Sequence, residues 1–521
     1  MTSSERFAAA TYKSHAVDAY KNNPLIEALE QFETDELLAQ YLERTNPRFD
    51  EQQREFPKTT RLQLISGLSR FAVALPRTQE LARALINLLM EGYVGRSVPE
   101  SKEFRTQTQE IFENQKQKQP LESLKARTIG AELSTALIGA SGSGKSTALR
   151  LISQLYAPVY YHEESGAAQI PFLIFDLPHD GRSIHSLATA IIEEIDRLVP
   201  SGRYAEIYLS RTRKNANDRI YDAIRLVRFH CVGLLIVDES QNQKVVAKKP
   251  ARGRKASPHE DTGLSPSIET PLISQLITTS NRLGVPLVLV GTNELHDVIS
   301  GRFSQSRRAC GHGIERWGFL KRSGDVRKPD EFEALVRKLW RYQWLREPVK
   351  FSDAWSNLFF ELTQGNPDII VKLFASAQRR ALNSNLEGLT EELIRETFAA
   401  EFNSVHRPLQ AVSTQNAEEL VQFIDIAPAN LRTGPGFAEA AKKLNVEKYE
   451  NPSLTGAQPS APRAKRPRST AVEQTPTVPD GASTKRKKVV NLADALSAGQ
   501  KADVEKRLRK SGGLASSHEE I

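Results

Sequence analysis

The sequence predicts an α/β fold with a parallel sheet flanked by helices, and three observations predict it. Between about residues 126 and 300, short apolar runs without alternating polar residues are separated by amphipathic helical patterns. Each apolar run ends where polar residues begin, as strands of a parallel sheet do at their carboxyl ends. A glycine-rich segment follows the first run and leads directly into a helical pattern.

Four apolar runs are the expected strands of this sheet, and their lack of alternation predicts burial on both faces. They are residues 134–140, 170–177, 232–239 and 285–292.

The remaining chain divides by composition and periodicity into helical and polar parts. We expect a helical region over 1–125, the α/β domain over 126–325 with a basic insertion at 241–271, a small helical lid over 326–410, an extension over 411–458, a basic disordered linker over 459–490 and a short terminal helix with its tail over 491–521.

Composition limits the class of protein. The chain has 521 residues, of which 39% are hydrophobic, and this is enough to bury a sizeable core. Its two cysteines, Cys231 and Cys310, exclude a disulfide framework and a four-cysteine zinc site. No run approaches the roughly 18 apolar residues of a membrane helix, and the first residues lack the apolar core of a signal peptide. We therefore expect no membrane association and a reducing, cytoplasmic location.

The net charge of +8 is concentrated in two segments. Residues 244–258 carry six positive charges and no negative one, whereas residues 463–488 carry eight positive and two negative charges. The rest of the chain is slightly acidic. Two basic, Pro- and Ser-containing segments in one chain predict a polyanionic partner such as nucleic acid. The clusters at 464–468 and 485–488 also resemble nuclear import signals, so a nuclear protein stays an alternative on charge alone.

The segment GASGSGKST fits the phosphate-binding pattern GxxxxGK[ST] and lies between an expected strand and an expected helix. Glycines let successive backbone N–H groups turn toward one anion. Lys145 is expected to reach the outer phosphates, and the hydroxyl of Ser146 to ligate Mg²⁺. The expected nucleotide-binding residues are Gly139, Ala140, Ser141, Gly142, Ser143, Gly144, Lys145, Ser146 and Thr147.

Two adjacent acids end the expected strand at residues 232–239. Four apolar residues followed by Asp238 and Glu239 form a pattern typical of nucleotide hydrolysis. In it the first acid holds the metal ion and the second orients the attacking water. Adjacent carboxylates repel one another unless a cation lies between them and the phosphates. The pair therefore predicts Mg²⁺-dependent hydrolysis.

The strand at 285–292 ends in Thr292 and Asn293, whose polar groups can hydrogen-bond the attacking water or the γ-phosphate. On chemical grounds alone, Asn293 is the favoured one of the two for this role. A later segment supplies Arg302, Arg307, Arg308 and Arg316. An arginine inserted beside the γ-phosphate of a neighbouring subunit stabilises transition-state charge, and the adjacent pair at 307 and 308 is the preferred candidate.

The order of these motifs resembles that of AAA+ P-loop ATPases, and more closely that of the TnsC family. TnsC proteins are the regulator ATPases of heteromeric cut-and-paste transposons and of their CRISPR-associated relatives. The resemblance spans most of residues 19–409. It lies in AYKNNPLIEAL (19–29), GYVGR (92–96), LIGASGSGKST, GLLIVDESQ, GVPLVLVGT (284–292), SRRACGHG (306–313), QGNPDIIVKLF (364–374) and SVHRPL (404–409).

The TnsC resemblance implies an ATP- and Mg²⁺-dependent homo-oligomer, a ring or filament, that binds duplex DNA along its backbone without reading sequence. It implies a target-selector protein of the TniQ or TnsD kind, for which residues 1–125 are the possible docking region. Transposase subunits are the other implied partners, with 491–521 as the possible contact. It also implies a bacterial cytoplasm with nucleoid association when DNA is bound. Comparison with the family favours Thr292 over Asn293, and the DNA-binding role falls to Arg211, Arg213 and Lys214.

Two features depart from the family pattern. The lid position that often carries a nucleotide-sensing arginine reads Gly365 to Asp368, which ends in an acid. Lys372 or Arg379 can substitute only if the helix is turned suitably. The basic insertion is also longer than expected. A binding scaffold in which ATP is structural, and a clamp-loader or initiator ATPase, therefore stay as alternatives.

Overall fold

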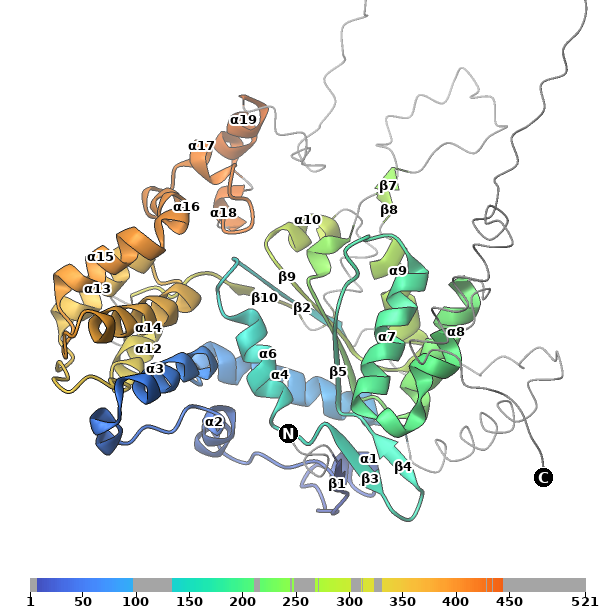
Figure 1. Ribbon diagram of the computed structural model, residues 1–521. Helices are drawn as coiled ribbons and strands as arrows, with labels where there is room; N and C mark the ends of the chain where they lie inside the picture. Colours follow the sequence, from blue (N-terminus) through green and yellow to red (C-terminus); the bar gives the residue numbers. More distant parts are fainter. Residues whose placement is uncertain are drawn as a thin grey trace, which may run out of the picture. The chain divides into compact units, whose positions relative to one another are not determined.

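Figure 1 shows the computed structural model of the chain. It describes residues 7–96, 134–209, 216–243, 246–247, 268–269, 271–300, 311, 313–322, 330–427, 429–432 and 434–443. The chain divides into two compact units, Met1–Ala457 and Gln458–Ile521, and every described residue lies in the first. The expected linker at 459–490 and the expected terminal helix at 491–521 lie outside the described residues.

The centre of the α/β domain is a five-stranded sheet in which every pairing is parallel. Its order is β10-β2-β9-β6-β5. The strands are β2 (Ser134–Gly139), β5 (Phe172–Asp176), β6 (Leu234–Asp238), β9 (Leu287–Gly291) and β10 (Ile314–Trp317). Four of the five are the expected strands. The edge strand β10 was not expected, because its sequence IERW has only two apolar residues.

Helices cover both faces of this sheet (Figure 1). Alternate residues of the strands pack against α7 (Ile184–Leu198), α8 (Ala216–Phe229) and α9 (Pro271–Leu283). The residues between them pack against α4 (Pro76–Tyr93) and α6 (Lys145–Ser153). Both sides of β2, β5, β6 and β9 are therefore apolar, which explains why the four expected runs did not alternate. The expected α/β fold with a parallel sheet flanked by helices is confirmed.

The N-terminal region is mostly helical, as expected. Its helices are α1 (Pro24–Glu27), α2 (Asp35–Glu43), α3 (Lys58–Ser66) and α4. A small second sheet was not expected: β1 (Phe7–Ala9) pairs in parallel with β3 (Val159–His162), which pairs antiparallel with β4 (Ala167–Gln169).

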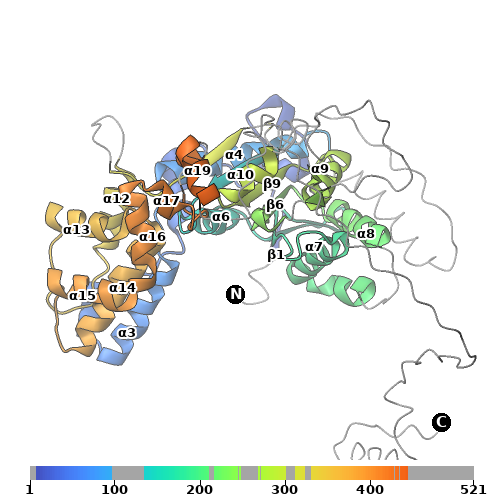
Figure 2. The same ribbon diagram turned by 90° about the horizontal axis from the view of Figure 1, so that it is seen from above.

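The region expected to be the lid is helical, and residues of the N-terminal region share its apolar core. Its helices are α12 (Glu331–Leu339), α13 (Asp353–Thr363), α14 (Pro367–Asn383), α15 (Glu391–Glu401) and α16 (Asn403–Thr414). Helix α3 of the N-terminal region packs beside α14 in both views (Figures 1 and 2). Arg61 of α3 makes a bidentate ion pair with Glu387, at 2.7 and 3.0 Å. The N-terminal region therefore reaches from the sheet to the lid.

The short helices α17 (Ala417–Leu420), α18 (Ala429–Arg432) and α19 (Pro435–Lys443) follow the lid and share their own small apolar cluster. The remaining described elements are short: α10 (Glu294–Ser300), β7 (Val246–Ala247), β8 (Ile268–Glu269), 3-10 turns at Asp18–Tyr20, Glu51–Glu55, Gly67–Arg70, Pro200–Gly202 and η7 (Ser240–Asn242), and a π turn at Ala205–Leu209. Among the described helices, none combines the length and the apolar character that crossing a membrane requires.

Candidate nucleotide-binding site

The glycine-rich loop joins β2 to α6, as the sequence predicted. Gly142 and Gly144 have φ values of +75° and +93°, a region that favours glycine. A Cβ at Gly142 would also lie 2.7 Å from the side-chain amide of Asn366, which caps the first turn of α14. Glycine is therefore suited to these positions for two reasons: it adopts the positive φ values of the loop, and at Gly142 it leaves room for Asn366.

Lys145 folds back over the loop. Its ammonium donates to Gly139 O at 2.8 Å and to Ala140 O at 2.9 Å, and the residue is only 8% exposed. Burial lowers the pKa of Lys145 to about 8, although the nearby carboxylates of Asp238 and Glu239 oppose this shift. The amine thus lies in the loop where bound phosphates would supply the negative charge that stabilises its protonated form.

The acid pair lies directly opposite the start of α6. Ser146 Oγ donates to Asp238 Oδ2 at 2.9 Å, and Glu239 follows Asp238 at the end of β6. A hydroxyl and a carboxylate oxygen are ligands that Mg²⁺ prefers, together with water and phosphate oxygens. The residues present therefore fit the expected ion, which Ser146 and Asp238 would hold.

The two polar residues after β9 have different surroundings. Thr292 Oγ1 is buried and has no hydrogen-bond partner among the described residues, and the Thr292 N–H donates to Gln241 Oε1 at 3.0 Å. Asn293 is 7% exposed, and its amide donates to Ala427 O at 2.7 Å. The hydroxyl of Thr292 is thus unengaged, whereas the amide of Asn293 holds the segment after α17.

A cavity of about 440 Å³ opens beside the loop, which is a size suited to a small-molecule ligand. The loop and α6 form one wall, α14 with Asp368 and Lys372 forms another, and a largely apolar segment at residues 69–78 forms a third. Lys372 Nζ pairs with Asp368 at 2.6 Å. Arg379 instead donates to Ser376 Oγ and does not line this cavity.

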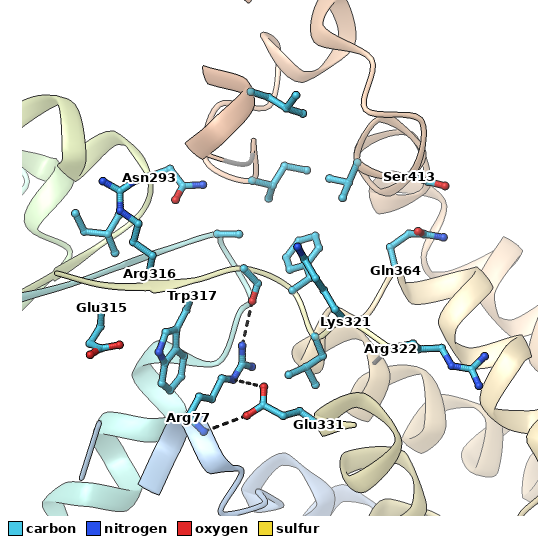
Figure 3. A pocket seen from close by; sticks show the side chains of 18 of the residues that line it. Arg77, Asn293, Glu315, Arg316, Trp317, Lys321, Arg322, Glu331, Gln364 and Ser413 are labelled. Carbon is cyan, nitrogen blue, oxygen red and sulfur yellow. Dashed lines mark hydrogen bonds and ion pairs between the residues drawn. The ribbon is translucent and has the colours of Figure 1, made fainter. Parts of the chain in front are cut away.

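Arg77, at the start of α4, was not singled out from the sequence, and it joins four parts of the molecule. Its guanidinium donates to Ser143 O at 3.0 Å and to Gly318 O at 3.1 Å, and it lies 4.6 Å from the centre of the Trp317 ring. It also pairs with Glu331 at the start of α12 (Figure 3). Burial lowers the pKa of Arg77, and Glu331 opposes the shift.

A second, larger cavity of about 1160 Å³ is also lined by Arg77 (Figure 3). Arg316 of β10 lines it together with Asn293 and residues of the C-terminal extension. That extension also contacts the phosphate-binding loop, because Ser141 N–H donates to Asp425 O at 3.1 Å. Arg432 of α18 pairs with Asp297 of α10.

The structure thus brings together most of the residues expected to bind and hydrolyse nucleotide. The loop, Lys145, Ser146, Asp238 and Glu239 meet at one end of the sheet, and Thr292 joins them through Gln241. Several expected residues lie outside the described residues: the arginines Arg302, Arg307 and Arg308, and the DNA-binding candidates Arg211, Arg213 and Lys214.

Comparison with known proteins gives a family match for one part of the chain. A family model described as an AAA domain matches residues 128–299. No curated protein matches the chain. The matched residues include the loop, the acid pair and Thr292.

Three solved structures show how far the similarity extends. The RuvB Holliday junction branch migration motor of Thermotoga maritima is 14% identical, with a TM-score of 0.27, over 62% of this chain and 76% of that chain. The Aeropyrum pernix ORC2 protein with ADPNP and ADP is 14% identical, with a TM-score of 0.34, over 60% and 76%. Its ADP form is 13% identical, with a TM-score of 0.32, over 63% and 72%.

Proposed function

Because residues 128–299 form an AAA domain and the chain has the AAA+ P-loop ATPase fold, we propose that it is an ATP-dependent regulator of DNA transposition. In this proposal the chain binds duplex DNA as a homo-oligomer. It links a target-selector protein to transposase subunits, and ATP hydrolysis drives disassembly. The AAA domain supports ATPase activity, and the role in transposition rests on the sequence resemblance to TnsC.

The observation that carries the chemical part is the contact between Ser146 and Asp238 at 2.9 Å, with Glu239 next in the chain. In the proposed site, Lys145 and the N–H groups of the loop bind the phosphates of ATP. Mg²⁺ held by Ser146 and Asp238 would neutralise charge on the phosphate oxygens. Glu239 orients the attacking water, and the Thr292 hydroxyl hydrogen-bonds the water or the γ-phosphate.

Support for a DNA partner comes from the charge of the sequence and from the family resemblance. The basic segments at 244–258 and 463–488 are suited to phosphate contacts, which give salt-dependent affinity without sequence reading. Arg211, Arg213 and Lys214 are the proposed contacts within the α/β domain. Arg307 and Arg308 are the proposed arginines that a neighbouring subunit supplies, so that hydrolysis depends on assembly.

One observation favours a second candidate function, a DNA-binding scaffold with negligible turnover. Asp368 occupies the lid position that often carries an arginine, and the nearest lid cation in the cavity, Lys372, is paired with this acid. Among the described residues, the one lid cation that lines this cavity is therefore already engaged by an acid, and such a lid stabilises the transferred phosphate less. A clamp-loader or initiator ATPase has no comparable observation in its favour.

Steady-state ATP hydrolysis with and without duplex DNA separates these candidates. The regulator predicts turnover that DNA stimulates, and the scaffold predicts flat, negligible turnover in both conditions. Glu239→Gln should bind ATP and DNA and fail to turn over, whereas Lys145→Ala should lose nucleotide binding itself. DNA-independent hydrolysis by wild-type protein, or rapid hydrolysis by Glu239→Gln, would contradict the proposal.

A further inference from the structure

The turn after β6 is held by the side chains of consecutive residues. Ser240 Oγ donates to Val237 O at 2.8 Å, and Asn242 Nδ2 donates to Leu177 O at 3.0 Å. Gln243 Nε2 donates to Gly181 O at 2.9 Å, and its Oε1 accepts two N–H groups from the first turn of α9. These three residues therefore anchor the turn to the surrounding structure. Gln241, between them, contacts the proposed catalytic groups instead.

Gln241 bridges the end of β6 and the residue after β9. Its Nε2 donates to Glu239 Oε2 at 2.5 Å, and its Oε1 accepts the Thr292 N–H at 3.0 Å. An N–H group requires an acceptor, so the amide oxygen must face Thr292. The NH₂ end must then face the carboxylate of Glu239. Both the NH₂ group and the oxygen of the Gln241 amide are therefore hydrogen-bonded, and Glu239 and Thr292 together fix its orientation.

Gly291 leaves the space that this bridge occupies. A Cβ at Gly291 would lie 2.6 Å from Gln241 Oε1 and 3.1 Å from Leu295 Cβ. Any larger residue would displace the amide from Thr292 N–H, or α10 from the end of β9. A glycine at a strand end beside another group is typical of such a close approach. A glycine at the end of β9 therefore leaves room for the side-chain amide of Gln241 to reach Thr292 N–H.

The backbone of Glu239 also points to a special geometry. Glu239 has φ 51° and ψ 32°, a left-handed conformation that costs a non-glycine residue on the order of 1 kcal/mol. Two backbone contacts offset this cost: its N–H donates to Asp238 Oδ1 at 2.8 Å, and its carbonyl accepts from Asn242 N–H at 2.9 Å. The backbone is therefore fixed. The side chain of Glu239 is exposed, and among the described residues Gln241 is its one hydrogen-bond partner.

We propose that Gln241 is a positioning residue for ATP hydrolysis. It holds the carboxylate of Glu239 and couples it to the backbone of Thr292, so that the water-orienting acid and the polar end of β9 keep one relative geometry. This inference rests on the proposed role of Glu239. A carboxylate without this contact samples more rotamers and reaches the attacking water in fewer of them, which slows the chemical step and leaves nucleotide binding unchanged.

Steady-state kinetics of the full chain with Mg²⁺ and duplex DNA test the proposal. Gln241→Ala should lower kcat roughly 10- to 100-fold and change KM for ATP less than about twofold. Asn242→Ala is the matched control, because it removes a side-chain amide of the same turn that contacts neither Glu239 nor Thr292 and keeps the backbone N–H that the Glu239 carbonyl accepts. It should keep the wild-type kcat and KM. A wild-type kcat for Gln241→Ala, or an equal loss in Asn242→Ala, would overturn the proposal.

A double-mutant comparison distinguishes positioning from a general structural role. In the Glu239→Gln background, adding Gln241→Ala should leave residual single-turnover hydrolysis unchanged, because the group that Gln241 positions is already lost. Further slowing in the double variant overturns the proposal. If Glu239→Gln loses turnover while Gln241→Ala does not, only the role of Gln241 fails. If Glu239→Gln hydrolyses ATP at the wild-type rate, the proposed role of Glu239 and the inference fail together.

Discussion

Ser146 donates a hydrogen bond to Asp238 across 92 residues of sequence, and this contact joins the phosphate-binding loop to the end of β6. Strands β2 and β6 are not neighbours in the sheet, because β9 lies between them. The helix start after β2 must therefore reach over the end of β9 to meet the acid. Because Thr292 follows β9, the same strand order places it between the end of β2 and the end of β6.

Removing either member of this contact should raise the Mg²⁺ requirement for hydrolysis. Ser146→Ala and Asp238→Asn each remove an oxygen ligand or its charge, and we expect the half-saturating Mg²⁺ concentration to rise roughly tenfold or more. Mg²⁺ titration of ATPase activity checks this. Ser153→Ala is the control, because Ser153 lies on the same helix and its hydroxyl only donates to Arg150 O. An unchanged Mg²⁺ requirement in both variants would contradict the assignment of the ion.

Nucleotide affinity should weaken as the pH rises above 8. In the free protein the pKa of Lys145 is lowered to about 8 by burial, and bound phosphates favour the protonated amine and raise that pKa. Below pH 8 the amine is charged in both states, so affinity is flat. Above pH 8 binding must take up a proton, and Kd should rise up to about tenfold per pH unit.

The affinity of a non-hydrolysed ATP analogue, measured from pH 7 to 9.5, tests this dependence. Lys145→Arg is the control, because a guanidinium stays charged over this range. We expect Lys145→Arg to bind the analogue more weakly than the wild type does, with an affinity that does not change between pH 7 and 9.5. A wild-type profile that stays flat to pH 9.5 would show that the amine is charged in the free protein as well.

Arg77 should matter for both stability and nucleotide binding. Arg77→Ala removes the donor to the carbonyls of Ser143 and Gly318 and the side-chain ion pair with Glu331, which keeps only the backbone N–H of residue 77. Loss of one partner of a largely buried pair costs about 3 kcal/mol. Because one of these carbonyls belongs to the loop, we also expect KM for ATP to rise. Urea unfolding and steady-state kinetics measure the two effects.

Arg83→Ala on the same helix is the control for Arg77. Its ion pair with Asp35 is largely exposed, and such pairs contribute less than about 1 kcal/mol. We expect a small change in its unfolding free energy and no change in KM. Equal effects of the two substitutions would show that Arg77 has no specific connection to the loop.

The ion pair between the N-terminal region and the lid predicts an acid-dependent loss of stability. Hydrogen bonds from Arg61 lower the pKa of Glu387 to about 2 from its ordinary value of 4.5. The lowered pKa contributes stability that is fully present above pH 4.5 and is lost as the pH falls toward 2. Glu387→Gln should therefore be less stable than wild type at pH 7, and the difference should shrink between pH 4.5 and 2.

Urea unfolding of wild type and Glu387→Gln at several pH values checks this. Glu396→Gln provides a matched control, because Glu396 pairs with Arg380 at 3.3 Å while 64% of its side chain is exposed. Its unfolding free energy should follow that of the wild type at every pH. A constant difference between Glu387→Gln and wild type from pH 7 to 2 would mean that Arg61 does not hold the ionised form.

Local patterns in the sequence were enough to predict four strands of the sheet and the place of the glycine-rich loop between β2 and α6. Strands buried on both faces give continuous apolar runs, and the loop and acid pair occupy positions fixed relative to those strands. Edge strand β10 has two charged residues among its four, so its sequence contains no continuous apolar run that would have predicted it. Arg77 and Gln241 carry no motif either. Their partners lie far away in the chain or act through single carbonyl, carboxylate and N–H groups that only the folded structure brings together.

The central claim is that bound ATP assembles this chain on duplex DNA and that hydrolysis releases it. Electron microscopy and mass measurement of the full chain on duplex DNA test it most directly, with ATP, with a non-hydrolysed analogue and without nucleotide. We predict DNA-bound oligomers with the analogue, persistent oligomers for Glu239→Gln with ATP, and no nucleotide-dependent assembly for Lys145→Ala. A wild-type chain that stays monomeric on DNA in all three conditions would contradict the claim.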